Sequence, residues 1–391
     1  MFLETTQHRN PALIDVAHEL HARGQIDPDT YVIDRDTVAE NARAIAGTAA
    51  AHGVVPWFVV KQIGRNPLLA ATIAEAIPRA AAIDVREVSG LLRAGARLGN
   101  VGHLVQIPRR SLPRVLSARP AYATVYDVAN LEAVDAAAAE LGTVQDVILR
   151  IAGDPETTYP GQEGGIEAAD VLAVLERASR LAHVRVAGVT GFPCVLFDAR
   201  TGVTTLTPTF DRVMAAAEVM RAYGVEPVVS LPSHSSCSTI PLLAAAGATH
   251  VEPGHALTGT TPEHVVRDDL EERPALVYVS EVAQVGPRAA LFGGGFYARG
   301  RARNVLVGSG DRARRGHLAT APGENIDYYR RFDLDPGSEP AVLGEVALMA
   351  FRTQIFVTRS RVAVVSGIAS GRPVVDGIFD SLGNAVPEET V

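Results

Sequence analysis

The sequence is nearly free of lysine. Lys61 is the only lysine among 391 residues, and arginine supplies the other 35 of the 36 Lys and Arg side chains. A guanidinium stays protonated and cannot form an imine, whereas a lysine amine beside an apolar strand can lose its proton and react. Because Lys61 follows the apolar run VVPWFVV, we interpret it as a reactive amine. The alternative is an ordinary surface cation in an arginine-rich chain.

Cysteine, targeting signals and long apolar runs are also scarce. Cys194 and Cys237 are the only cysteines, and two cysteines at this spacing indicate neither a disulfide framework nor a zinc site. The N-terminus lacks a basic region followed by an apolar run, and no apolar run is long enough to span a membrane. A net charge of −8 argues against binding to nucleic acid or anionic lipid. We therefore expect a cytoplasmic protein with a small-molecule partner and no metal.

The remaining sequence shows a regular alternation of strand-like and helical runs between residues 30 and 265. The strand-like runs are short and apolar on both faces, as in a parallel sheet covered by helices. They end near Lys61, Asp84, Gln106, Tyr126, Arg150, Val189, Ser230 and Val251. Eight such units predict an α/β fold of the (β/α)8 barrel type. A doubly wound open sheet is the alternative, although it usually has fewer strands.

The pattern changes near residues 260–272, which divides the chain into predicted domains. We predict a helical segment at residues 1–29 and the barrel at residues 30–265. Residues 266–391 are rich in β-type runs with Gly and Pro turns, which predicts a C-terminal β domain. The strand expected at 30–34 could join either the barrel or this β domain.

Polar residues follow many of the predicted barrel strands, at the rim where barrel enzymes carry their sites. They are Lys61, Asp84, Gln106, Arg150, the cluster at 233–236 and Glu252. The segments SLPSHSSCST (230–239) and VEPGHALTG (251–259) follow the last two strands, where barrels often bind phosphate. Gly254 would let backbone amides approach an anion closely. The alternative is that the polar residues cap structural elements and Gly254 only makes a turn.

A lone amine and a phosphate cradle on one rim suggest pyridoxal 5′-phosphate (PLP). The chain resembles the fold-type III PLP-dependent enzymes, is similar to alanine racemases, and is most similar to their YhfX-like branch. The resemblance covers about residues 28–375 and is carried by TYVIDRDTVAENARAI, WFVVKQIGRNP, VEPGHALTG and GGGFYARGR. It implies a PLP-binding barrel followed by a β domain. It also implies a head-to-tail homodimer in which each active site is completed by the partner subunit.

The resemblance assigns roles to individual residues. Lys61 resembles the lysine that forms the Schiff base with the cofactor, and Arg150 the arginine beside its phenolic oxygen. Tyr297 resembles the catalytic tyrosine of racemases; its alternative is a β-domain tyrosine at a glycine turn. The residues that resemble the phosphate ligands are Ser236, Gly254 and His255, and Ser235 is also expected to bind the cofactor.

Departures from racemases leave the reaction open. Glu252 stands where alanine racemases carry arginine, and fold-type III decarboxylases have the same Glu-Pro-Gly. A carboxylate there would keep the pyridine nitrogen protonated and strengthen the ring as an electron sink. The histidine that stacks on the ring in relatives is not apparent, and Phe192 could replace it. Arg299 and Arg352 could bind the substrate carboxylate.

We therefore expect a PLP-dependent amino-acid racemase or epimerase, an isomerase. In this interpretation Lys61 and Tyr297 exchange the α-proton on opposite faces of the substrate. The alternatives are a PLP-dependent amino-acid decarboxylase and a non-catalytic PLP-binding protein.

Overall fold

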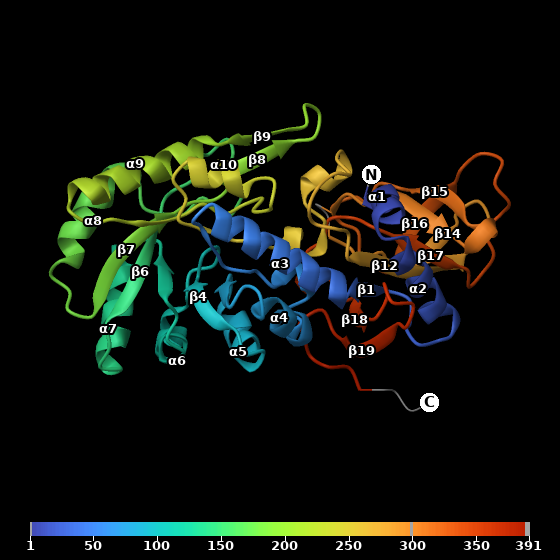
Figure 1. The fold of residues 1–391 in the computed structure, drawn as a ribbon, viewed down its shortest axis with the longest axis horizontal. Helices are drawn as coiled ribbons and strands as arrows, with labels where there is room; N and C mark the ends of the chain where they lie inside the picture. Colours follow the sequence, from blue (N-terminus) through green and yellow to red (C-terminus); the bar gives the residue numbers. More distant parts are fainter. Residues whose placement is uncertain (1, 298–299, 388–391) are drawn as a thin grey trace. The chain divides into compact units, whose positions relative to one another are not determined.

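The computed structural model describes residues 2–297 and 300–387. The chain divides into two compact units (Figure 1). The barrel unit consists of Ala42–Val60 and Ile73–Gly254. The sheet unit consists of Met1–Asn41, Lys61–Thr72 and His255–Val391. No helix among the described residues is long and apolar enough to cross a membrane.

The barrel unit contains eight parallel strands paired in the order β2-β11-β10-β7-β6-β5-β4-β3. A parallel bridge between Phe58 and Ala80 joins the chain just after β2 to β3, so the strands form a nearly closed ring. This arrangement confirms the predicted (β/α)8 barrel. The strands are β2 (Val55–Pro56), β3 (Arg79–Ala82), β4 (Arg97–Val101), β5 (Tyr122–Val125), β6 (Gln145–Arg150), β7 (Val184–Thr190), β10 (Val228–Ser230) and β11 (His250–Val251).

Helices alternate with these strands along the chain; α7 packs against β6 and β7, and α9 packs against β7 (Figure 1). Side-chain caps define several helix starts: Asp84 accepts from the Arg86 N–H at 2.8 Å, which makes this candidate site residue a helix cap. The α-helices are α3 (Arg35–Ala51), α4 (Pro67–Ala74), α5 (Val85–Arg93), α6 (Leu112–Ser117), α7 (Val128–Glu140), α8 (Val171–Ala178), α9 (Pro208–Ala222) and α10 (Ile240–Ala245). Short 3-10 helices, η2 (Arg109–Ser111) and η3 (Ala168–Asp170), precede α6 and α8.

The chain departs from the predicted pattern in two places. The prediction of a strand that ends near Gln106 is wrong, because β4 ends at Val101 and residues 102–106 form a loop. Gly102 has φ +94°, which ends an extended strand at that point. The sequence pattern also failed to predict a hairpin between β7 and α9, formed by β8 (Val195–Asp198) and β9 (Val203–Leu206).

The sheet unit contains a nine-stranded sheet in the order β13-β16-β15-β14-β17-β12-β1-β18-β19. Strand β13 also pairs with β12, so six antiparallel strands, β12 to β17, close into a ring of their own. Strand β1 (Thr30–Asp34) pairs antiparallel with β12 and parallel with β18. The remaining strands are β12 (Leu276–Gln284), β13 (Ala290–Phe292), β14 (Asn304–Val307), β15 (Arg314–Leu318), β16 (Tyr329–Leu334), β17 (Val346–Met349), β18 (Arg361–Ser366) and β19 (Val374–Phe379).

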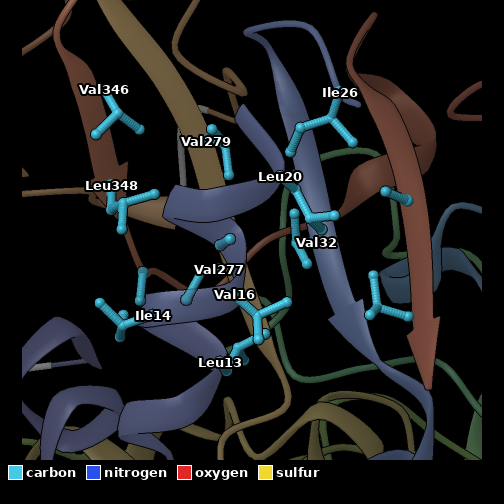
Figure 2. Packing of buried hydrophobic residues seen from close by; sticks show 14 of the residues in the cluster. Leu13, Ile14, Val16, Leu20, Ile26, Val32, Val277, Val279, Val346 and Leu348 are labelled. Atoms are coloured by element: carbon cyan, nitrogen blue, oxygen red, sulfur yellow. The ribbon is translucent and has the colours of Figure 1, made fainter. Parts of the chain in front are cut away.

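An N-terminal helix covers one face of this sheet. The helix predicted near residues 11–23 is α2 (Pro11–Ala22), preceded by α1 (Phe2–Arg9). Figure 2 shows the apolar side chains of α2 packed against those of β12 and β17. The helix contributes Leu13, Ile14, Val16 and Leu20, and the strands contribute Val277, Val279, Val346 and Leu348. Full burial of each such side chain stabilises the fold by about 1.5–3 kcal/mol. The unit also contains the 3-10 helices η1 (Lys61–Ile63), η4 (His255–Thr258), η5 (Pro262–Val265), η7 (Gly310–Arg312) and η8 (Ile355–Val357).

Candidate active site

Arg150 ends strand β6, and its charged side chain is buried at the carboxyl end of that strand. Its side chain is 1% exposed, and Nη2 donates to the carbonyl oxygens of Gln162 (3.4 Å) and Phe192 (3.3 Å). Within the described residues, its Nε and Nη1 are buried with no hydrogen-bond partner. Burial lowers the pKa of Arg150, which shows that the environment disfavours the charged form. Two unsatisfied donors on a buried cation suit an anionic ligand.

Tyr126 lies one residue beyond β5, and its ring is beside Arg150. The Arg150 Cζ is 6.0 Å from the Tyr126 ring centroid, and the Tyr126 hydroxyl donates to the His103 carbonyl oxygen at 2.7 Å. Burial raises the pKa of Tyr126 to about 12, although the charge of Arg150 opposes this shift. Tyr126 therefore remains a neutral hydrogen-bond donor at neutral pH and holds the loop after β4 in place.

His103 and Glu252 form a buried pair in the same unit. The His103 Nε2 lies 3.8 Å from the Glu252 Oε2, and the two side chains are 1% and 2% exposed. Thr190 at the end of β7 places its Oγ1 3.5 Å from the His103 Nδ1. The Phe192 ring is edge-on to the imidazole, with a centroid separation of 6.0 Å. A carboxylate and an imidazole are thus held together at the ends of β4, β7 and β11.

Sequence reasoning missed His103. The predicted strand ran through residues 102–106, which placed this histidine in the middle of a strand. The signal that could have found it is Gly102, because a glycine after an apolar run often ends a strand. Gln106, the residue expected at the rim, bonds to its own neighbour in the chain: its Nε2 donates weakly to the Ile107 carbonyl oxygen at 3.4 Å.

The serine loop after β10 is held by its own hydroxyl groups. Ser235 Oγ accepts from the Glu252 N–H at 3.1 Å, which ties the loop to the residue after β11. Ser236 is 1% exposed, and its Oγ lies 2.9 Å from Ser238 Oγ and 3.1 Å from Thr239 Oγ1. Ser233 adopts φ +87°, a left-handed conformation that is costly for a residue with a side chain. This loop is a compact turn that orients Glu252.

Gly254 is the last residue of the barrel unit, and the other predicted site residues belong to the sheet unit. Lys61 begins η1 and is half-buried. His255 follows Gly254 and begins η4; its Nε2 lies 2.9 Å from the Thr353 carbonyl oxygen, and Arg352 Nε lies 3.3 Å from the same nitrogen. Tyr297 is half-buried. Arg299 lies outside the described residues.

Two family models together match most of the chain. Residues 33–262 match the alanine racemase N-terminal domain, and residues 277–375 match the YhfX-like C-terminal domain. An uncharacterized protein, YhfX, of Escherichia coli (strain K12) is 37% identical over 391 residues, covering 99% of this chain and all of the relative. The chain belongs to the YhfX-like branch of the alanine racemase-like, fold-type III family. PLP is the cofactor of this family.

Solved structures share the fold of this YhfX-like chain at low sequence identity. An alanine racemase from Clostridium difficile 630, in complex with cycloserine, has a TM-score of 0.64 at 15% identity, over 90% of this chain and 98% of that one. A diaminopimelate decarboxylase from Helicobacter pylori has a TM-score of 0.66 at 12% identity, over 91% and 94%. A D-threonine aldolase from Filomicrobium marinum has a TM-score of 0.62 at 15% identity, over 91% and 95%. These neighbours perform different reactions on one fold, so the fold alone does not select the reaction.

Proposed function

We propose that this protein is a PLP-dependent amino-acid racemase or epimerase. The observation that carries the proposal is the position of the only lysine. Lys61 directly follows a barrel segment whose backbone is bonded on both sides: Trp57 N–H donates to the Val251 carbonyl oxygen (2.9 Å) and Phe58 N–H to that of Arg79 (3.1 Å). A lysine directly after a barrel strand would lie where barrel enzymes carry their chemistry.

The chemistry of the buried side chains in the barrel unit fits the cofactor. Arg150 offers two donor nitrogens, Nε and Nη1, that have no hydrogen-bond partner among the described residues and suit the cofactor's phenolic oxygen. Glu252 offers a buried carboxylate for the protonated ring nitrogen, and Ser235 orients it through the backbone. Ser236, Gly254 and His255 would hold the phosphate, and Lys61 would hold the carbonyl carbon. When bound, PLP supplies an electron sink that stabilises negative charge at the α-carbon of an amino acid.

Racemisation requires proton exchange on both faces of the substrate. In the proposal Lys61 Nζ moves the α-proton on one face and Tyr297 Oη moves it on the other. Tyr297 would act in the site of a partner subunit, and Arg352 would bind the substrate carboxylate. Exposed aromatic residues near the Tyr297 loop, namely Phe292, Tyr328 and Tyr329, support a partner surface there, because large exposed apolar groups favour association. We therefore propose a homodimer with shared sites.

Glu252 favours a second candidate, an amino-acid decarboxylase. Glu252 is buried beside His103, where its carboxylate would keep the ring nitrogen protonated. A protonated ring is the stronger electron sink that decarboxylation needs, and racemases carry arginine at this place. Both reactions pass negative charge into the cofactor, and they differ in which bond to the α-carbon breaks. A racemase breaks the C–H bond, whereas a decarboxylase breaks the C–C bond and releases carbon dioxide.

The deciding experiment incubates the PLP-loaded protein with each L-amino acid in D2O. We expect α-deuterium incorporation together with conversion to the D-enantiomer, and no carbon dioxide. Amine and carbon dioxide as products would establish the decarboxylase instead. Borohydride reduction should attach the cofactor to the peptide that contains Lys61. A protein that binds PLP but neither exchanges deuterium nor releases carbon dioxide with any amino acid would contradict both enzymatic candidates.

A further inference from the structure

The glycine loop that carries Tyr297 is bonded at four successive residues. Residues 293–296 consist of three glycines and a phenylalanine, a sequence with great backbone freedom in isolation. Each of the four residues nevertheless has a hydrogen bond from its backbone to another part of the sheet unit. The bonds are Gly293 N–H to Tyr328 O (2.8 Å), Gly294 N–H to Tyr278 Oη (2.8 Å), Tyr31 Oη–H to Gly295 O (2.9 Å) and Phe296 N–H to Asp327 Oδ2 (3.0 Å).

The two tyrosines beneath the loop are fully buried and are themselves oriented by hydrogen bonds. Tyr31 of β1 and Tyr278 of β12 are paired in register, and their rings meet edge to face at 5.0 Å. Tyr278 donates its proton to Asp29 Oδ1 at 2.7 Å, so its oxygen is available to accept from the loop. Tyr31 donates to the loop and lies 2.9 Å from the Thr353 hydroxyl. Each phenol therefore has one defined orientation.

Asp29 and Asp327 complete the support. Asp29 is buried, also accepts from the Ser360 hydroxyl, and has Arg359 Nε 3.4 Å from its Oδ2. Burial raises the pKa of both carboxyls. A carboxylate that is costly to bury is retained where its hydrogen bonds fix a geometry. Here those bonds fix Tyr278 and the Phe296 amide.

The loop approaches these side chains so closely that only glycine fits. A Cβ built on Gly295 would lie 2.5 Å from Tyr31 Oη, and one on Gly293 would lie 2.8 Å from Tyr278 Oη. Both glycines also adopt positive φ, +65° for Gly293 and +53° for Gly295. The triple glycine is thus matched to the tyrosine pair beneath it, and the chain continues directly from this fixed backbone into Tyr297.

We propose that Tyr31, Tyr278 and Asp327 are positioning residues for the reaction, because they hold the 293–296 backbone and thereby aim Tyr297. The inference rests on the proposed role of Tyr297 as the second base. A reacting group displaced by about 1 Å costs up to about 100-fold in rate. A flexible triple-glycine loop without these bonds would allow larger displacements than that.

The test compares Tyr31→Phe, Tyr278→Phe and Asp327→Asn with two controls, Tyr223→Phe at the end of α9 and Asp333→Asn in β16, which change exposed side chains. The first readout is amide hydrogen–deuterium exchange of the peptide containing residues 293–297, measured without PLP. The second readout uses the PLP-loaded enzyme with one enantiomer of the substrate in D2O. It measures two rates separately, the inversion of chirality and the incorporation of α-deuterium without inversion. The nearly isosteric Asp327→Asn keeps the test open if a buried tyrosine variant fails to fold.

We expect faster amide exchange in the three variants and unchanged exchange in the controls. Inversion should fall about 10- to 100-fold, while the wash-in served by Lys61 changes less than about twofold. Unchanged amide exchange would overturn the inference, as would faster exchange with full inversion. Tyr297→Phe distinguishes the proposed base from its positioning. Full inversion in Tyr297→Phe would overturn the proposed base. If Tyr297→Phe loses inversion but Tyr31→Phe, Tyr278→Phe and Asp327→Asn keep it in full, only the positioning role is overturned.

Discussion

Two groups of buried polar side chains, one in each unit, differ in how completely they are hydrogen-bonded. In the barrel unit, Arg150 keeps two buried nitrogens without hydrogen-bond partners among the described residues. In the sheet unit, the hydroxyls of Tyr31 and Tyr278 and the carboxylate of Asp29 each have two or more partners. An unsatisfied buried donor costs about 1–3 kcal/mol, so it persists where a ligand supplies the missing acceptor. A satisfied network instead fixes a single geometry.

This contrast separates residues that serve a ligand from residues that hold the fold. Changes of the first kind should remove function and leave stability intact or improved. Changes of the second kind should reduce stability and leave cofactor affinity intact. Four substitutions test that separation, beginning with the largest expected effect.

Lys61→Arg should have the largest effect, because arginine keeps the positive charge but can neither attach the cofactor covalently nor release a proton. We expect α-proton exchange to fall at least about 1,000-fold. The unfolding free energy should change by less than about 1 kcal/mol, since Lys61 is only half-buried. Deuterium incorporation and thermal melting measure the two quantities. Exchange that survives in the variant would mean that Lys61 is not the reactive amine.

Arg150→Met should separate affinity from stability most clearly. PLP affinity should fall about 10- to 100-fold, because a hydrogen bond to a charged group contributes about 1.5–3 kcal/mol. The protein without PLP should melt at the same or a higher temperature, because the variant no longer buries an incompletely bonded charge. Arg185→Met is the control, since Arg185 forms an exposed pair with Asp146. If Arg150→Met melts at a lower temperature while binding PLP normally, Arg150 is structural.

Tyr278→Phe should give the opposite result to Arg150→Met. The loss of one hydroxyl leaves the Gly294 N–H and the Asp29 carboxylate each without a partner that they have in the wild type. We expect the unfolding free energy without PLP to fall by about 1–3 kcal/mol. PLP affinity should be unchanged, and urea titration with a PLP-binding curve checks both. A loss of affinity with normal stability would reverse our assignment.

Asp29→Asn should have the smallest effect, confined to the pH dependence of stability. Burial raises the pKa of Asp29 above its ordinary value of 3.8, so the folded state binds the proton more tightly than the unfolded state. The contribution of Asp29 to stability is therefore fully present below about pH 4 and falls as pH rises through the raised pKa, by about 1.4 kcal/mol for each pH unit that separates the folded and unfolded pKa values. The asparagine variant would carry no such titration, and asparagine tolerates the φ of +65° at this position. Urea unfolding from pH 4 to 8 should show a flatter profile than the wild type; an identical profile would exclude Asp29 as the cause.

Much of the fold follows from local sequence signals. Strand β1 of the sheet unit spans the predicted residues 30–34, and Asp34 caps the following helix, α3, by accepting from the Thr37 N–H at 3.1 Å. Apolar runs on both faces mark buried parallel strands, and such runs are visible without tertiary information. Strands β15 (RRGHL) and β16 (YRRFDL) were not predicted, because charged side chains interrupt them and they are held by their neighbours in the sheet.

The candidate site was less predictable than the fold. Residue type alone pointed to Lys61, and position after a strand pointed to Arg150 and Glu252. The unsatisfied nitrogens of Arg150 and the pairing of His103 with Glu252 depend on how distant strands meet. The tyrosine pair beneath the glycine loop depends on the register between β1 and β12. No local pattern encodes such a register.

The position of β1 has a consequence for how the chain folds during synthesis. Thr30 pairs with Val279 of β12 on one side and with Arg361 of β18 on the other. Because β1 lies near the N-terminus, it leaves the ribosome early, whereas its partners β12 and β18 emerge only after the whole barrel has been made. Pairing of this kind across long sequence separations closes slowly. Until then β1 has unpaired edges and apolar faces, a state in which a strand is prone to pair with other chains.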